Sequence, residues 1–176
     1  IAAARHLGGR LASFVALTLP MQLWERRMRA TGGPGIVRLQ LAGEPPTAYS
    51  LLERWGAAGR NAARQQTWAD FAYLKSYAYA GVCGAELLRR RTSPGTRWDR
   101  SGRVVRWLPA IAATFYAAEN VLLLRTLAAS DHGEPLDAGA LRATRTAAMA
   151  KFGLLALTIG WAVGAATIGA RSNRGR

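Results

Sequence analysis

Cysteine and histidine are scarce in this chain, which has one Cys and two His among 176 residues. A single cysteine excludes an intrachain disulfide framework, and these three residues are too few for a Cys/His zinc site, which takes four ligands. The sequence also contains none of the GxSxG, Walker or HExxH motifs. We therefore expect no metal site and no catalytic residues, and we expect the protein not to be an enzyme.

Acidic residues are also few, because 10 Asp and Glu stand against 24 Lys and Arg, which gives a formal net charge of +14. The hydrophobic half of the chain falls in long blocks, with arginines between them. This segregation is typical of a membrane protein. A soluble helical bundle is the alternative that the mean hydropathy of +0.00 permits. It is disfavoured because residues 147–170 offer no polar face to water.

Long apolar segments predict the fold. A helix needs about 20 mostly apolar residues to cross a bilayer. Such segments occur at about residues 7–24, 67–88, 104–127 and 147–170. The sequence therefore predicts an all-α protein, a four-transmembrane-helix bundle that forms one multi-pass domain over residues 1–176.

The first loop carries a further helix signal. Two prolines, Pro45 and Pro46, precede apolar residues at helical spacing that end with Trp55, and Gly56 follows. We expect a short amphipathic interfacial helix whose Leu52 and Trp55 enter the acyl boundary. Its basic residues would meet lipid phosphates: Arg54, Arg60 and Arg64. The alternative, a helix packed on the protein's own loops, stays open.

The second loop is rich in arginine and predicts the orientation. In a four-span protein this loop and both termini share one side, and short basic loops stay on the cytoplasmic side. We expect both termini on the cytoplasmic or matrix-equivalent side of a bacterial plasma membrane or an organellar inner membrane. Anionic lipids or an acidic partner, rather than nucleic acid, are the expected contacts of this loop. The residues concerned are Arg89, Arg90, Arg91, Arg97, Arg103 and Arg106.

The first segment has an alternative reading as well. The chain opens with Ile1 instead of Met, which predicts a processed or truncated N-terminus. Residues 7–24 are then alternatively the remnant of a targeting segment. The basic cluster that follows residue 24 favours a retained span.

Ionisable residues within the predicted spans are the main candidates for a site. Charged groups are costly inside a bilayer, so they normally face the bundle and pair. Matching their depths predicts that Glu119 pairs with Lys75 and that Asp70 pairs with Lys151, with Asn120 beside them. A proton or cation relay and a headgroup pocket are the functional readings. The structural reading, in which two acids and two bases only fix helix register, is favoured.

Small residues and histidines complete the candidates. Gly160 and Gly164 form a GxxxG in the last span, which predicts close approach of a neighbouring helix. His6 and His132 fall on opposite sides of the membrane in this topology, so they cannot share one haem. We expect no cofactor, although lipids are possible ligands.

These residues carry a resemblance to a known family. Leu39-Gln40-Leu41-Ala42-Gly43, Trp55-Gly56, Asp70-Phe71 with Tyr77-Ala78, Glu119-Asn120 and Lys151 stand in this order. In this pattern the chain, over about residues 36–164, resembles an uncharacterised family of small bacterial four-helix integral membrane proteins. The resemblance implies four spans with polar residues at these positions and no established activity. Lys75 and the arginine-rich second loop depart from the pattern and suggest a role specialised toward a partner.

The expected function follows from these features. The leading prediction is a structural or accessory subunit of a larger membrane complex in an energy-transducing membrane, with other membrane-protein subunits and anionic lipids as partners. The first alternative is a small proton- or ion-coupled transporter or membrane enzyme that uses Asp70 and Glu119. The second alternative is a lipid-binding membrane organiser.

Overall fold

Helices account for all of the regular structure in the part of the chain that is described. The structure is a computed structural model that describes residues 20–174, with side chains to residue 167. The expected first span, 7–24, therefore lies almost wholly outside the described residues. Residues 20–30 are helical, and the further helices are α2 (Ile36–Gln40), α3 (Pro45–Arg90), α4 (Arg97–Val105), α5 (Leu108–His132) and α6 (Ala138–Arg174).

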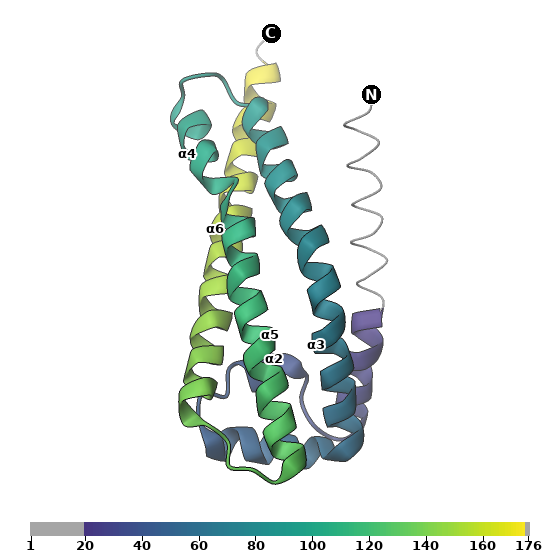
Figure 1. Cartoon of the computed structure of the whole chain (residues 1–176). Coiled ribbons are helices and arrows are strands. Elements are labelled where there is room, and N and C mark those ends of the chain that lie inside the picture. The colour runs from purple at the N-terminus through teal and green to yellow at the C-terminus, as the bar shows by residue number, and fades with distance from the viewer. Residues whose placement is uncertain (1–19, 175–176) are drawn as a thin grey trace.

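Three long helices form the body of the molecule. α3, α5 and α6 run side by side along one axis, and α5 packs against both of the others (Figure 1). α2 is a short helix that contacts α3 and α6 near one end of this bundle. We call this end, at the bottom of Figure 1, the base. The opposite end, at the top, carries α4 and the last turns of α6.

α3 is bent at Gly56 near the base. The backbone there has φ 55° and ψ −167°, a combination that essentially only glycine adopts. Pro45 and Pro46 occupy the first helical turn, where a missing N–H breaks no helical bond. We call residues 45–55 the foot helix. It crosses beneath the bundle in Figure 1 before the chain turns upward. The predicted helix start at Pro45 is confirmed, whereas the chain stays helical beyond the bend at Gly56, past Gly59, as far as Arg90.

The apolar side of the foot helix faces the protein itself. Leu52 and Trp55 are each 1% exposed and belong to a core with Leu39 of α2 and Leu123 of α5. The Trp55 indole N–H also donates to the carbonyl of Pro34 at 2.6 Å. The prediction that Leu52 and Trp55 contact lipid is therefore wrong. These side chains are used to close the base, as in the alternative packing on the protein's own loops.

The helix boundaries also differ from the expected spans. The third segment, 104–127, is divided, because α4 ends at Val105 and α5 starts at Leu108. Pro109 lies in the first turn of α5, where it starts a helix more easily than it continues one. The second segment, 67–88, lies within α3, and α6 begins before the expected 147–170, because Leu141 and Thr144 are buried in its first turns.

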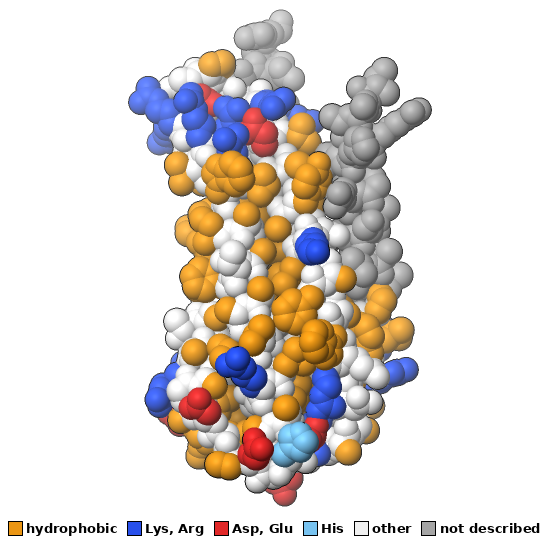
Figure 2. Space-filling model, in the orientation of Figure 1, with side chains coloured by type: hydrophobic (Ala, Val, Ile, Leu, Met, Phe, Trp, Pro, Cys, Tyr) orange, Lys and Arg blue, Asp and Glu red, His pale blue; other side chains and the backbone are white. Residues whose placement is uncertain are grey.

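The face of the bundle in Figure 2 differs in side-chain character along its length. On this face charged side chains gather at both ends, with a mostly hydrophobic band between them. Two stretches, Arg97–His132 and Ala138–Thr167, are long and apolar enough to cross a membrane, and only 28% and 22% of their apolar windows are buried. A core helix of a soluble protein is mostly buried. By length and composition these two helices indicate a membrane protein, whereas four spans are not confirmed.

Candidate functional site: a buried charge cluster

Three ionisable side chains meet inside the bundle. Asp70 of α3, Glu119 of α5 and Lys151 of α6 are 1%, 0% and 4% exposed. Each lies about 9 Å along its helix from the nearest arginine toward the base. The helices thus bring together three of the residues that the sequence predicts as a charge network.

The central contact is a buried ion pair between α5 and α6. Glu119 Oε2 lies 2.8 Å from Lys151 Nζ. The same ammonium group lies 3.9 Å from the ring centroid of Tyr116 and 4.6 Å from that of Phe152. Aromatic faces attract a desolvated cation, so the Lys151 charge is enclosed by one carboxylate and two rings. The predicted pairing of Glu119 with Lys75 is wrong, since Lys151 takes that place.

Asp70 stands beside this pair and has no base of its own. Its surroundings are the phenol of Tyr116 and the charges of Lys151 and Glu119. Neither carboxyl oxygen accepts a hydrogen bond of regular geometry from a described residue. Tyr73, one helical turn further along α3, stacks on Tyr77 with ring centroids 6.2 Å apart. Tyr116 is therefore the polar side chain that connects Asp70 to the Glu119–Lys151 pair.

Lys75 is not part of the cluster. Its side chain is exposed and makes no ion pair or hydrogen bond with any described residue. The reason lies in the helix period, because a residue five positions after Asp70 is rotated by about 140° around the axis. The pairing of Glu119 with Lys75 was wrong because it considered only the depth of each residue along its helix. It did not consider the direction in which each side chain points around the helix axis.

α2 contributes a residue that the sequence analysis did not single out as a site. Gln40 is 3% exposed and, with Lys151, is one of the two polar side chains that act on the Glu119 carboxylate. Asn120 is fully buried, as predicted for a network member, but neither of its amide atoms has a described partner. A helix of five residues is too short to show a hydrophobic periodicity, so the sequence does not reveal which side of it is buried. The only sequence feature that marks Gln40 is that it is a polar residue among apolar ones.

The charge balance of the cluster differs from the expected one. Two acids and two bases were predicted, which favoured a purely structural role. With Lys75 outside, two acids share one base. A second buried carboxylate beside the first strongly favours the protonated form of one of them. The cluster therefore has one more acid than it has bases, and it also fixes the register of three helices.

A second charge cluster lies at the end opposite the base. Glu86, which no sequence motif marks, accepts hydrogen bonds from Arg89, Arg90 and Arg106 at 2.8, 2.9 and 3.0 Å. Asp99 of α4 pairs with Arg89 and Arg103. These contacts fasten α4 to the end of α3.

The electrostatics of Asp99 follow from its donors. Hydrogen bonds from the Arg103 side chain, the Gly95 backbone N–H and Arg89 lower the pKa of Asp99 to about 2. At the base, burial acts to raise the pKa of Asp131, but hydrogen bonds from Arg60 and Arg64 outweigh it and lower that pKa. Both carboxyls are thus charged at neutral pH.

These ion pairs change the expected contacts of the arginines. Arg60 and Arg64 were expected to meet phosphates, yet Asp131 engages both. The arginines that were expected to contact lipid or an acidic partner divide into two groups. Arg89, Arg90, Arg103 and Arg106 are held by Glu86 or Asp99, whereas Arg91 and Arg97 are exposed and pair with no described acid.

The two glycines of the last helix have different surroundings. A Cβ added at Gly164 would lie 2.3 Å from the Trp98 ring of α4, whereas a Cβ at Gly160 would meet nothing within 4 Å. The small residue at 164 therefore admits an aromatic ring of this chain instead of a neighbouring long helix. The indole N–H of Trp161 donates to the hydroxyl of Ser101 at 3.0 Å and completes this contact.

No known protein family, curated protein or solved structure matches this chain. The family resemblance of the sequence pattern thus stays a prediction.

Proposed function

We propose that this chain is a multi-pass integral membrane protein that serves as an accessory subunit of a larger membrane complex. Four spans are proposed. Three of them are α3, α5 and α6, and the fourth is the segment that precedes α2 in the sequence. Both termini are assigned to the cytoplasmic or matrix-equivalent side, where the arginines of residues 89–106 gather. The observation that carries the proposal is the exposed Lys75 on α3.

Lys75 lies far from both charged ends of α3. It is about 16 Å beyond Arg64 and about 21 Å before Arg89 at 1.5 Å per residue. A lysine side chain reaches only a few ångströms toward an interface. At the centre of a spanning helix a lone lysine costs about 2.5 to 3.5 kcal/mol. A lysine at this depth therefore needs a counter-charge within the membrane.

Among the described residues, no exposed carboxylate lies at the depth of Lys75 to provide that counter-charge. Asp70 and Glu119 are the acids nearest in depth, and both are buried around Lys151. Residues 1–19 contain neither Asp nor Glu. The expected partner is therefore a transmembrane helix of another subunit that carries a carboxylate opposite Lys75. An accessory subunit fits this requirement better than a protein that functions alone.

Extraction in a mild detergent, followed by native gel separation and mass spectrometry, tests the proposal. The tagged wild-type chain should migrate with a larger complex at fixed stoichiometry. Lys75→Met should release the chain from this complex, and the charge-retaining control Lys75→Arg should not. Because Lys75 is exposed, the released Lys75→Met chain should unfold at the wild-type temperature.

Charge exchange identifies the partner group. Lys75→Glu should abolish assembly, and a Lys in place of the partner's transmembrane carboxylate should restore it. A wild-type chain that migrates alone would refute the subunit function. A Lys75→Met chain that stays in the complex would refute docking through Lys75.

Asp70 favours a second candidate, a proton-coupled transporter or membrane enzyme. Its carboxyl is 1% exposed and lacks a base of its own, and acids inside a membrane-spanning segment are typical of proton relays. Proteoliposomes with an entrapped pH-sensitive dye test this candidate. Wild type should dissipate an imposed pH gradient and Asp70→Asn should not. Equal rates in the two would exclude Asp70 as the proton carrier.

A further inference from the structure

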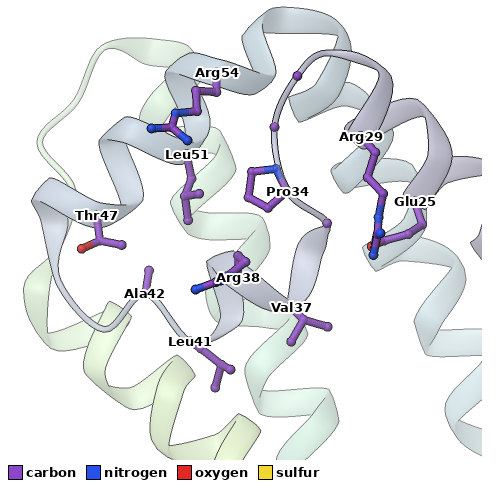
Figure 3. Close-up of a pocket in the computed structure, with 13 residues that line it drawn as sticks. Glu25, Arg29, Pro34, Val37, Arg38, Leu41, Ala42, Thr47, Leu51 and Arg54 are labelled. Atoms are coloured by element: carbon purple, nitrogen blue, oxygen red, sulfur yellow. Dashed lines mark hydrogen bonds and ion pairs between the residues drawn. The ribbon is translucent and has the colours of Figure 1, made fainter.

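A large pocket opens at the base beside the foot helix. Its volume is about 980 Å³. The loop at residues 31–35, α2 and the foot helix line it, and Figure 3 shows its side chains. The loop is fixed by the hydrogen bond from the Trp55 indole to the Pro34 carbonyl. A second bond runs from the Ile36 N–H to Glu25 Oε2 at 3.3 Å, so the wall of the pocket is held in place.

Two arginines give the pocket its charge. Arg38 of α2 and Arg54 of the foot helix both line it, as Figure 3 shows. Neither guanidinium forms an ion pair or hydrogen bond with a described residue. The third arginine, Arg29, is paired with Glu25 at 2.9 Å. The pocket thus has two uncompensated positive charges, and Thr47 also lines it.

An apolar path leads out of the pocket toward the hydrophobic band. Val37 and Leu41 line it and are 45% and 37% exposed. Leu41 also lines a second pocket, of about 380 Å³, together with Arg145, Met149 and Phe152 of α6. Met149 and Phe152 are themselves exposed. The apolar surface therefore continues from the arginines onto α6.

We propose that this pocket binds an anionic phospholipid. The phosphate lies between Arg38 and Arg54, and the acyl chains lie over Leu41, Met149 and Phe152. Guanidinium groups bind phosphate through paired charge-assisted hydrogen bonds. The volume far exceeds that of a free phosphate, and the apolar path matches the tails. The base lies where the hydrophobic band ends, which is the level of lipid headgroups in the proposed membrane orientation.

Binding of dioleoyl phosphatidylglycerol to the delipidated full-length chain in detergent tests the proposal. Affinity is measured by native mass spectrometry across a lipid titration. The variant Arg38→Gln/Arg54→Gln should bind about tenfold or more weakly, since each charge-assisted hydrogen bond contributes to affinity. The control Arg26→Gln/Arg142→Gln removes two exposed charges outside both pockets and should bind like wild type. Each single pocket variant should show an intermediate loss.

Two further ligands distinguish the sources of the phosphate. Dioleoyl phosphatidylcholine has the same tails without net charge and should bind more weakly. Inorganic phosphate should compete only at far higher concentration than the lipid. Equal binding of phosphatidylcholine, equal binding of free phosphate, or equal losses in the pocket and control variants would each overturn the assignment. Lys75→Met should bind the lipid like wild type, so this result is independent of complex assembly.

Discussion

Removing the single base from the buried cluster should be the most costly change to it. Lys151→Met leaves Glu119 and Asp70 without a positive charge. Glu119 is fully buried and lies 2.8 Å from Lys151. Loss of one partner of such a pair costs about 3 to 5 kcal/mol. At about 2 to 4 °C per kcal/mol for a chain of this size, the unfolding temperature should fall by roughly 10 °C.

Substitutions of the two acids, Asp70 and Glu119, should have different effects on stability, and these effects should not be additive. Asp70→Asn should leave stability unchanged or raise it, because it removes a buried carboxyl that has no base of its own. Glu119→Gln should cost less than Lys151→Met, because Asp70 remains to neutralise Lys151. The double variant Asp70→Asn/Glu119→Gln leaves the ammonium group alone and should cost more than the sum of the two single variants.

The assay is thermal unfolding of the purified chain in mild detergent at pH 7, followed by tryptophan fluorescence. A Lys151→Met chain that unfolds at the wild-type temperature would refute the ion pair as a stabilising contact. Strictly additive effects of Asp70→Asn and Glu119→Gln would refute the sharing of one base by two acids.

Three further predictions concern the ends of the bundle. Gly164→Ala should lower the free energy of unfolding by about 1 to 3 kcal/mol, because the added methyl group clashes with Trp98. The control Gly160→Ala should raise it by about 0.5 to 1 kcal/mol. Equal effects of the two variants in thermal unfolding would contradict the contact between Gly164 and Trp98. Asp99 has a lowered pKa, so its contribution is complete above about pH 4 and is lost as pH falls toward 2. Asp99→Asn should weaken the tryptophan fluorescence change over this acid range, and an unchanged transition would exclude Asp99 as its source. Gly56→Ala should destabilise the fold by about 1 to 3 kcal/mol in the same thermal assay, and wild-type stability would show that the bend does not need glycine.

The sequence predicts where the helices lie along the chain better than it predicts which side of each helix faces its neighbours. Hydropathy placed Glu119 and Lys151 in successive spans and in the same leaflet, and the structure brings them together. The matching of depths had instead paired Glu119 with Lys75 and Asp70 with Lys151. Depth is one coordinate, however, and contact also depends on which way a side chain points around its helix. Asp70 and Lys75 differ by five positions and so face different ways, which the helix period alone would have shown.

Other features were beyond the reach of a single sequence. Gln40 joins the cluster because a short helix inside an expected loop packs against α6. Trp55 has the amphipathic spacing of a lipid-facing residue, and the same spacing serves a helix that covers a protein core. Local pattern gives the apolar face of a helix, whereas the identity of what covers that face depends on tertiary contacts.

The bend at Gly56 has a consequence for the biosynthesis of the chain. Without it, α3 would continue as a straight helix of roughly 69 Å, more than twice the thickness of the hydrocarbon core. The foot helix would then project into water and display Leu52 and Trp55, which are buried in the folded protein. Exposed apolar patches of this kind promote aggregation. The same apolar surface is exposed in a newly made chain until the bend at Gly56 forms. We therefore expect chaperones and proteases to recognise the chain before this bend has formed and not afterwards.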